Sequence, residues 1–457
     1  MNFDTFFLMI VMKFGGSSVA NAERIRHVAE IVKTHLSRKP ALVLSAMGDT
    51  TDFLLEAGNT AYQKGIVSLD KIKKSHLGTA KNLKLKDQKE IKTLLDELQS
   101  LLSGISLLKE LTPRTKDYLV SFGERLSVRI AAVYLEQLGI KAKFFDAWDV
   151  GFISDSNFTS AELLSESWKL IPQKLTPLIK SGILPVITGF IAKDKNGNIT
   201  TLGRGGSDLT ATMVAASCKA EEVQIWKDVD GILTADPRII KKAKPVEIAT
   251  YDEAAELAYF GAQVLHPRTM QPCMKTGTPV VIKNSYNPTA RGTKIVSSFE
   301  GGRTYARKQH PICSITFKRN VTLIDIVSLR MLRQPGFLAE VFSRFAHYGI
   351  SVDMVATSEA SISLTLDATN ELTSLKKDLV RIANVEIKTG KAIITIIGDV
   401  RRSSEILTRA FKTCETIGVQ VQMVSQGASK VNISFIVDDA KAELVVQAIH
   451  ACFFEHS

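Results

Sequence analysis

Apolar and polar positions alternate in blocks over the first 300 residues of the chain. Short apolar runs typical of buried strands lie at 6–14, 41–44, 183–188 and 223–226. After the first run, Ile25, Val28 and Val32 recur at helical spacing, and Ser18 or Asn21 can cap that helix. Strand and helix then keep alternating until residues 293–298. This rhythm predicts an α/β fold, with a mostly parallel sheet and helices on both faces.

The last 150 or so residues follow a different pattern. Phe342, Gly349 and Ile350 are repeated 69 residues later as Phe411, Gly418 and Val419. Each copy is expected to form a strand, a helix and two strands, which is the order of a small ferredoxin-like module. The expected domains are 1–300, 309–385 and 386–457, joined by a linker at 300–308. The C-terminal end could instead complete the first module.

Composition narrows the class of protein. The chain has 457 residues, of which 45% are hydrophobic and 23% charged, as in ordinary globular proteins. We expect no transmembrane helix, because no run of 18 apolar residues occurs, and no signal peptide, because Asp4 precedes the first apolar run. The five cysteines are widely spaced without a CxxC pair, which disfavours a disulfide framework or a zinc site and predicts a reducing cytoplasm.

The net charge of +11 raises the question of an anionic partner. Nine lysines between Lys64 and Lys92 face three acids, interleaved with leucines at helical spacing. We interpret this stretch as helices with a solvated face. Nucleic-acid binding is disfavoured because no aromatic side chains accompany the lysines, and DNA retention that falls with salt would be its signature.

Two glycine-rich turns carry candidate chemistry. Residues 13–18 (KFGGSS) follow the first strand, and residues 203–208 (GRGGSD) follow a hairpin with Asn196-Gly197 at its turn. Glycines let the backbone approach a ligand closely, and a helix N-terminus offers free amides to an anion. Lys13 and Arg204 add one cation to each turn. Together the turns suit a ligand with several phosphates, although each alone could be an ordinary turn.

Two further segments are less specific. A polar loop follows the strand at 223–226, where Asp228 could accept from a nucleotide and Arg238 could reach phosphates. The alternative is a turn cluster built on Asp-Gly and Asp-Pro. Residues 121–124 (SFGE) are expected to form a short turn that opens a helix, in which Glu124 would ordinarily be a helix-dipole partner.

Taken together, KFGGSS, SFGE, GRGGSD, the run DVDG…TADPR at 228–238 and FGAQVLHPR at 260–268 resemble the aspartokinases, which have the amino-acid kinase fold. The repeated modules resemble ACT domains, the amino-acid sensors of that family. The resemblance extends from Val11 to about Phe454. The chain is too short for a fused homoserine dehydrogenase and lacks GxGxxG, so it is most similar to the monofunctional, lysine-sensitive kind.

The resemblance implies phosphoryl transfer from ATP to the side-chain carboxylate of L-aspartate, giving 4-phospho-L-aspartate, the first step toward lysine, threonine, methionine and diaminopimelate. That carboxylate is already ionised at pH 7, so no general base is needed. The enzyme must instead bring two anions into line and neutralise the migrating charge. Mg²⁺ would arrive with the nucleotide, without a dedicated protein cage of metal ligands.

The resemblance also implies residue roles. Lys13 would bridge the transferring phosphoryl group, and Asp208 would hold Lys13 and the substrate ammonium. Arg204 would clamp the α-carboxylate of aspartate, and Glu124 would pair with its α-ammonium. The other implied substrate contacts are Ser45, Thr51, Gly205, Gly206 and Ser207. The implied ATP contacts are Lys13, Phe14, Gly15, Gly16, Ser17, Lys227, Asp228, Leu233, Arg238, Gln263 and Val264.

Three of the ATP-side residues depart from the family pattern. Many relatives have Thr, Tyr and Lys where Lys227, Leu233 and Gln263 stand. We hypothesise that Lys227 replaces the charge missing at Gln263, if both side chains approach the same phosphates.

The first ACT-like module carries the family's effector positions, which fall at Met331, Gln334, Gly336, Phe337, Val352, Asp353, Ser358 and Glu359. The acids Asp353 and Glu359 suit the ε-ammonium of lysine, so feedback inhibition by lysine and a homodimer through these modules are expected. The alternatives are a glutamate or acetylglutamate kinase of the same fold, or a non-catalytic amino-acid sensor. No nucleic acid and no membrane is expected as a partner.

Overall fold

The computed structural model describes residues 9–259, 265–297, 311–328, 336–367, 371–426 and 431–455. The predicted linker at 300–308 and the candidate residues Gln263, Val264, Met331 and Gln334 lie outside these ranges. The chain forms two compact units. The first unit comprises Met1–Ile232, Glu247–Tyr251 and Val264–Ser298, and the second comprises Leu233–Val246, Asp252–Gln263 and Phe299–Ser457. The boundaries 1–300, 309–385 and 386–457 stay predictions.

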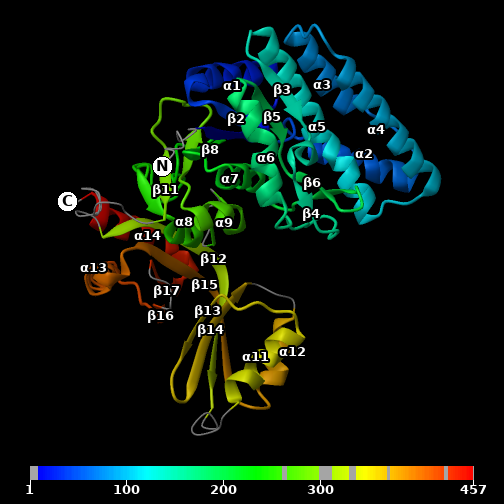
Figure 1. Ribbon diagram of the computed structural model, residues 1–457. Coiled ribbons are helices and arrows are strands. Elements are labelled where there is room, and N and C mark those ends of the chain that lie inside the picture. The colour runs from blue at the N-terminus through cyan, green and yellow to red at the C-terminus, as the bar shows by residue number, and fades with distance from the viewer. Residues whose placement is uncertain are drawn as a thin grey trace. The chain divides into compact units, whose positions relative to one another are not determined.

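A largely parallel sheet organises the first unit (Figure 1). Its described strands, in the order β3-β5-β2-β1-β8-β10-β11-β9, are Ala142–Phe145, Leu184–Thr188, Pro40–Leu44, Ile10–Phe14, Glu222–Lys227, Val280–Asn284, Thr293–Val296 and Ile248–Thr250. Only the β10–β11 pair among them is antiparallel. The four predicted strands thus adjoin one another as β5, β2, β1 and β8, and their carboxyl ends meet at one edge of the sheet.

Alternation along β1 decides which side chains reach the core. Ile10, Met12 and Phe14 are fully buried in the large apolar cluster of the unit. Lys13 lies between Met12 and Phe14, so its side chain leaves the opposite face of the strand. On that face it meets α7 (Gly206–Ser217), a helix buried along almost its whole length.

The other helices of the first unit explain the lysine-rich stretch. They are α1 (Ala22–His35), α2 (Thr50–Lys64), α3 (Asp70–Asn82), α4 (Lys89–Leu108), α5 (Pro113–Gln137), α6 (Ser167–Lys180) and α9 (Pro267–Thr276), whereas α8 (Tyr251–Tyr259) belongs to the second unit except for its first residue. Short 3-10 helices lie at Gly16–Val19 (η1), Leu36–Arg38 (η2) and Ala147–Val150 (η3). Within or directly after the lysine-rich stretch, Leu83, Leu94 and Leu95 pack inward while Lys71, Lys74 and Lys92 are exposed, which confirms the solvated-face interpretation.

One local prediction needs correction. SFGE is not a turn that opens a helix, because Ser121–Glu124 lie in the middle of the 25-residue helix α5. Helix α5 begins at Pro113. The side chain of Thr112 caps it by accepting the backbone N–H of Thr115. Of the two expected caps of the first helix, Asn21 is confirmed: its side chain accepts from the backbone N–H of Arg24 at the start of α1, after the short helix η1.

A small three-stranded sheet, β4-β6-β7, completes the first unit. Its strands are Ile153–Ser154, Ile191–Asp194 and Ile199–Thr201. β6 and β7 form the predicted antiparallel hairpin, and Gly197 at its turn adopts φ +82°. No helix in the described part of the chain has the length and apolar character needed to cross a bilayer.

The second unit is built on one continuous six-stranded sheet with the order β13-β14-β12-β15-β17-β16. The strands are Met354–Thr357, Ser361–Asp367, Ile312–Val327, Asn384–Gly398, Asn432–Asp438 and Met423–Ser425. Helices α11 (Phe337–His347), α12 (Leu372–Leu379), α13 (Ser403–Thr416) and α14 (Ala442–Phe454) pack on it, with short 3-10 helices at Val400–Arg402 and Asp439–Lys441. Each repeat therefore ends in a helix beyond the predicted strand, helix, strand and strand.

The two long central strands of this sheet serve both repeats. Ile324 of β12 and Ile387 of β15 pack in the cluster of α11 and α12. Ile315 of β12 and Ile394 of β15 pack in the cluster of α13 and α14. Because each strand crosses both clusters, the repeats share their central strands rather than standing as separate modules. The segment Leu233–Val246 also belongs to this unit, where Ala235 is buried in the second cluster.

Candidate active site

A pocket of about 520 Å³ lies in the first unit, at the edge where the strands end. It is lined by ten of the predicted site residues, Lys13, Gly16, Ser45, Thr51, Glu124, Arg204, Gly205, Gly206, Ser207 and Asp208. The loops after β1 and β2, helix α5 and the N-terminus of α7 each contribute to it. Segments distant in sequence therefore converge on one hollow, including both glycine-rich turns. Among them are all seven implied substrate contacts, which are Ser45, Thr51, Glu124, Arg204, Gly205, Gly206 and Ser207.

The floor of the pocket is a buried charge cluster. The Lys13 ammonium lies 2.7 Å from Oδ1 of Asp208, and both side chains are less than a tenth exposed. The Lys227 ammonium lies 3.4 Å from Oδ2 of the same carboxylate. Burial favours the neutral acid and would raise the pKa of Asp208, but the two ammonium groups outweigh burial and lower it. One carboxylate thus fixes two cations at the edge of the sheet.

Close backbone packing explains the glycines of both turns. A Cβ at Gly16 would lie 2.8 Å from the carbonyl oxygen of Ala46, so only glycine lets the loops after β1 and β2 approach this closely. In the second turn Gly205 has φ +76°, and a Cβ there would meet Thr269 at 2.7 Å. That conformation turns the chain into α7, whose first amides face the pocket.

Glu124 supplies a second buried carboxylate on the wall of the pocket. It is 3% exposed, and Oε1 accepts the backbone N–H of Ala46 at 3.1 Å. Oε2 has no hydrogen-bond partner within the described residues. Burial raises the pKa of Glu124 to about 8, against the opposing effects of the Ala46 amide and the more distant charge of Lys13. A cationic group of a ligand would satisfy this carboxylate.

Three lining residues were missed from the sequence, Ala46, Gly48 and Phe190, whereas Gly203 belongs to the predicted second glycine turn. Phe190 has φ +69°, a conformation that a bulky side chain rarely adopts. Its amide donates to Thr210 Oγ1 and its carbonyl accepts from Leu202, so the strain is held by α7 and by the strand that precedes the second turn. The sequence carries no signal for this residue beyond its place after Gly189.

The predicted nucleotide side is only partly assembled in the first unit. Lys227 contacts Asp208 and Asp228 is exposed, while Phe14 is buried and stacks on Trp226 with ring centroids 5.6 Å apart. Leu233 and Arg238 belong to the second unit. There Arg238 donates to Asp236 in a local two-pronged pair with a closest distance of 2.6 Å, as the turn-cluster alternative expects.

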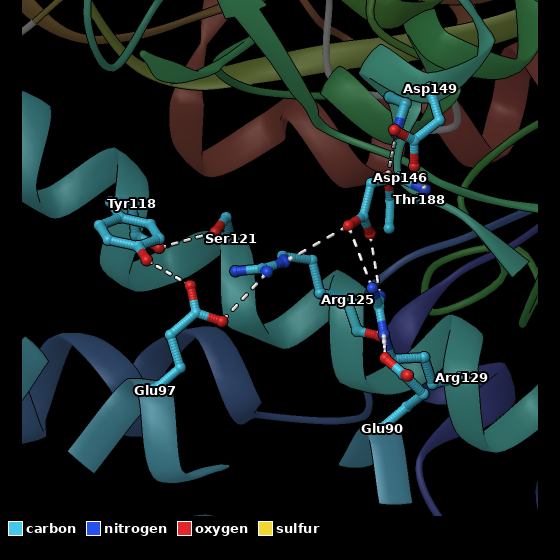
Figure 2. A network of polar contacts seen from close by, with 10 residues as sticks. Glu90, Glu97, Tyr118, Ser121, Arg125, Arg129, Asp146, Asp149 and Thr188 are labelled. Carbon is cyan, nitrogen blue, oxygen red and sulfur yellow. Dashed lines mark hydrogen bonds and ion pairs between the residues drawn. The ribbon is translucent and has the colours of Figure 1, made fainter. Parts of the chain in front are cut away.

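A charged network beside the pocket fixes α5, the helix that carries Glu124. Figure 2 shows Arg125 between Glu97 of α4 and Asp146, and Arg129 directed at Asp146. The Arg129–Asp146 pair has two hydrogen bonds, of 3.0 and 3.2 Å. The next residue after Asp146 donates its amide to Thr188 at the end of β5. This network therefore ties α4 and α5 to the sheet edge, and sequence patterns gave no indication of it.

The described effector candidates lie in the second unit. Gly336 has φ +98° and caps α11, and Phe337 is buried in its core. Ser358 bonds to Ser361, whereas Glu359 is exposed. Asp353 already has an internal partner, because the Lys318 ammonium lies 2.8 Å from Asp353 and 2.7 Å from Asp367.

Comparison with known proteins agrees with the fold. Residues 9–284 match the amino acid kinase family, and residues 324–376 and 394–453 match the ACT domain. The chloroplastic aspartokinase 1 of Arabidopsis thaliana is 52% identical over 97% of this chain and 80% of its own length. The lysine-sensitive aspartokinase 3 of Escherichia coli is 33% identical over 98% and 99%.

Solved structures agree as well. E. coli aspartokinase III, in complex with lysine and aspartate, has a TM-score of 0.79 at 34% identity and covers 98% of this chain and 99% of its own. The Clostridium acetobutylicum aspartate kinase has a TM-score of 0.84 at 27% identity, covering 97% and 100%.

The fold and the glycine-lined pocket therefore define an amino-acid kinase that carries ACT domains. Within that class the chain belongs to the aspartokinase family, and it is an ATP-dependent aspartate kinase.

Proposed function

We propose that aspartate binds between α5 and the second glycine turn, with its β-carboxylate directed at Lys13. Glu124 pairs with the α-ammonium and the Arg204 guanidinium clamps the α-carboxylate. The observation that carries this proposal is the pocket itself, which joins an unsatisfied buried carboxylate, an arginine and a buried Lys13–Asp208 pair within about 520 Å³.

The β-carboxylate of aspartate attacks the γ-phosphorus of ATP while the bond to the bridging oxygen of ADP breaks. Lys13 stabilises the charge that spreads over the phosphoryl oxygens, and Asp208 keeps Lys13 in place. The amides at the start of α7 supply further donors. The nucleotide enters the pocket past Lys227 and Asp228 at the end of β8. The backbone of Phe14, Gly15 and Ser17 lines this nucleotide side.

Mg²⁺ fits this arrangement as a companion of the nucleotide. Asp208 is already engaged by two lysines, and the described residues contain no group of three or more acids, histidines or cysteines that could hold a metal ion. The ion would be held by phosphate oxygens and water, with Asp228 as the exposed carboxylate within the loop, and it would neutralise phosphate charge.

Substrate choice is tested by ADP release with L-aspartate and L-glutamate as acceptors. We expect aspartate to be used and glutamate to be a poor substrate, because one more methylene moves its carboxylate away from Lys13 while Glu124 and Arg204 hold the α-centre. Comparable kcat/KM for glutamate or acetylglutamate would favour the alternative kinases, and ATP-independent aspartate binding alone would favour a non-catalytic sensor.

We propose feedback inhibition by lysine through the first ACT repeat. The proposal is supported by the structure of E. coli aspartokinase III, which was solved in complex with lysine and aspartate. Because Lys318 already occupies Asp353, the exposed Glu359 is the acid to which an effector ammonium has direct access. Glu359→Gln should raise the lysine concentration needed for half inhibition, whereas Glu386→Gln, an exposed acid elsewhere on the same sheet, should not. Wild-type activity that ignores millimolar lysine would contradict the proposal.

We further propose a homodimer through the second unit. Among the described strands of its sheet, β13 and β16 are the outermost and expose Val355 and Val424, and such edge strands can pair with another chain. Sedimentation of the purified protein tests this, and a monomer at micromolar concentration would overturn it.

A reducing compartment is proposed as well, because none of the five cysteines, all of which lie within the described ranges, forms a disulfide. The expected cytoplasm competes with a plastid, since the Arabidopsis relative is chloroplastic. A fluorescent fusion of the full-length protein would decide between the two compartments.

A further inference from the structure

Asp117 is a buried carboxylate that the mechanism above does not use. It lies on α5, seven residues before Glu124, and is 1% exposed. Seven residues correspond to two helical turns, so Asp117 and Glu124 lie on the same side of the helix. The two acids therefore face the same neighbouring structure at different heights.

The three donors of Asp117 come from β7, which leads to the second glycine turn, and from Thr159, whose loop packs against that turn. Oδ2 accepts the backbone N–H groups of Thr159 at 2.8 Å and Thr201 at 2.9 Å. Oδ1 accepts the Thr201 hydroxyl at 2.8 Å. Thr201 is the last residue of β7 and stands three positions before Arg204. All three donors are uncharged, so the carboxylate serves as a clasp rather than as half of an ion pair.

Thr159 connects the same clasp to the turn by a second route. It has φ +73°, and a Cβ on Gly203 would lie 3.5 Å from its carbonyl oxygen and 3.3 Å from Oγ of Ser160. The amide of Ala161 also donates to the carbonyl of Thr201 at 2.8 Å. The start of the glycine turn is thus fixed against a loop that Asp117 itself holds.

We propose that Asp117 is a positioning residue that sets the spacing between Glu124 and Arg204. These two side chains come from different elements, α5 and the turn after β7, and the Asp117 clasp joins those elements beside the pocket. In the proposed mode of aspartate binding, on which this inference depends, that spacing decides whether the α-ammonium and the α-carboxylate are held at once. Lys13 and Lys227 come from the main sheet, so the ATP side should be insensitive to it.

The primary test compares Asp117→Asn with Asp194→Asn. Asp194 is a matched control, because it is also buried and accepts from Asn196, Asn198 and the Ser156 hydroxyl, but at the far end of the same hairpin. We expect Asp117→Asn to raise KM for aspartate about tenfold, with KM for ATP and kcat at saturating aspartate within about twofold of wild type. Asp194→Asn should leave KM for aspartate near wild type.

A milder pair of variants keeps the test decisive if Asp117→Asn fails to fold. Thr201→Val removes one of the three hydrogen bonds and should raise KM for aspartate about threefold, and Thr201→Ser should restore it. Parallel increases in both KM values, or an unchanged KM for aspartate in a folded variant, would overturn the inference.

Failure of the proposed binding mode is recognised separately. Glu124→Gln and Arg204→Lys should each raise KM for aspartate on their own, and if neither does, the binding mode is wrong whatever Asp117 does. If both do, the double variant Asp117→Asn/Glu124→Gln should be non-additive, because Asp117 acts through the placement of Glu124. Additive effects would mean that Asp117 does not act through Glu124.

Discussion

The floor and the wall of the pocket hold two carboxylates that are almost equally buried yet differ in charge. Asp208, on the floor, has two ammonium groups within 3.4 Å, and its pKa is lowered. Glu124, on the wall, has one backbone amide and a raised pKa of about 8. Burial is similar, so the difference comes from the neighbouring cations. The carboxylate of Asp208 is neutralised by the protein's own lysines, whereas that of Glu124 has an oxygen without a partner among the described residues, which the substrate ammonium can contact.

The largest expected effect comes from removing the Lys13–Asp208 ion pair on the floor of the pocket. Lys13→Met removes the cation closest to Asp208 and the donor proposed to meet the phosphoryl group. We expect kcat to fall about 100- to 1000-fold, since losing one preorganised donor costs about 2.7–4 kcal/mol in the transition state. Coupled ADP release measures it. Lys33→Met, which breaks only a surface pair with Glu30, should keep full activity, and a loss below tenfold in a folded Lys13→Met protein would contradict the proposed role.

Glu124→Gln removes the carboxylate on the wall of the pocket instead. It should raise KM for aspartate about 10- to 100-fold, because a hydrogen bond to a charged group contributes roughly 1.5–3 kcal/mol. Unlike Lys13→Met, it should act mainly on KM for aspartate and much less on kcat. An unchanged KM would remove Glu124 from the substrate site.

The same variant tests the charge state. The pKa of Glu124 is raised from 4.5 to about 8, so between these values the folded protein binds a proton that the unfolded chain has lost. The contribution of Glu124 to the free energy of unfolding therefore decreases as pH rises from about 4.5 to about 8. Glu124→Gln should abolish this decrease, and it should be more stable than wild type at alkaline pH. Urea unfolding at several pH values measures it, and parallel curves would refute the raised pKa.

Gly123→Ala sharpens the comparison, because it should displace α5 from the loop after β2 without changing the charge of Glu124. A Cβ there would lie 2.8 Å from the Ala46 Cβ, beside the amide that Glu124 accepts. We expect a loss of about 1–3 kcal/mol in the free energy of unfolding. Gly104→Ala is the control, because Gly104 is also within a helix but has open space around it, and that change should stabilise by about 0.5–1 kcal/mol. Equal effects at both sites would contradict the close packing of α5.

The smallest effect is expected at the outer cation of the floor. Lys227→Thr should raise KM for ATP about two- to fivefold, since a partly exposed charge contributes roughly 1 kcal/mol or less. Lys227 is more exposed than Lys13 and farther from Asp208, which is why the effect is smaller. An unchanged KM for ATP would argue against compensation for Gln263.

Much of the sheet and pocket could be predicted because local patterns encode them. The apolar runs at 41–44 and 223–226 became β2 and β8, and glycine turns after strands brought Lys13 and Asp208 together. SFGE misled because its glycine suggests a turn, whereas Gly123 lies within a helix and is required by Ala46, 77 residues earlier in the chain (123 − 46). Phe190 and Asp117 were missed because their roles depend on long-range partners such as Thr210 and Thr201.

The long strands β12 and β15 have a consequence for how the second unit gains and loses structure. Each contributes side chains to both apolar clusters, through Ile315 and Ile324 in one strand and Ile387 and Ile394 in the other. Melting one repeat would strip the other of its central strands, so the pair should denature in a single cooperative transition. In such a sensor, a structural change in either repeat would be transmitted to the other through β12 and β15, because both repeats contain these two strands.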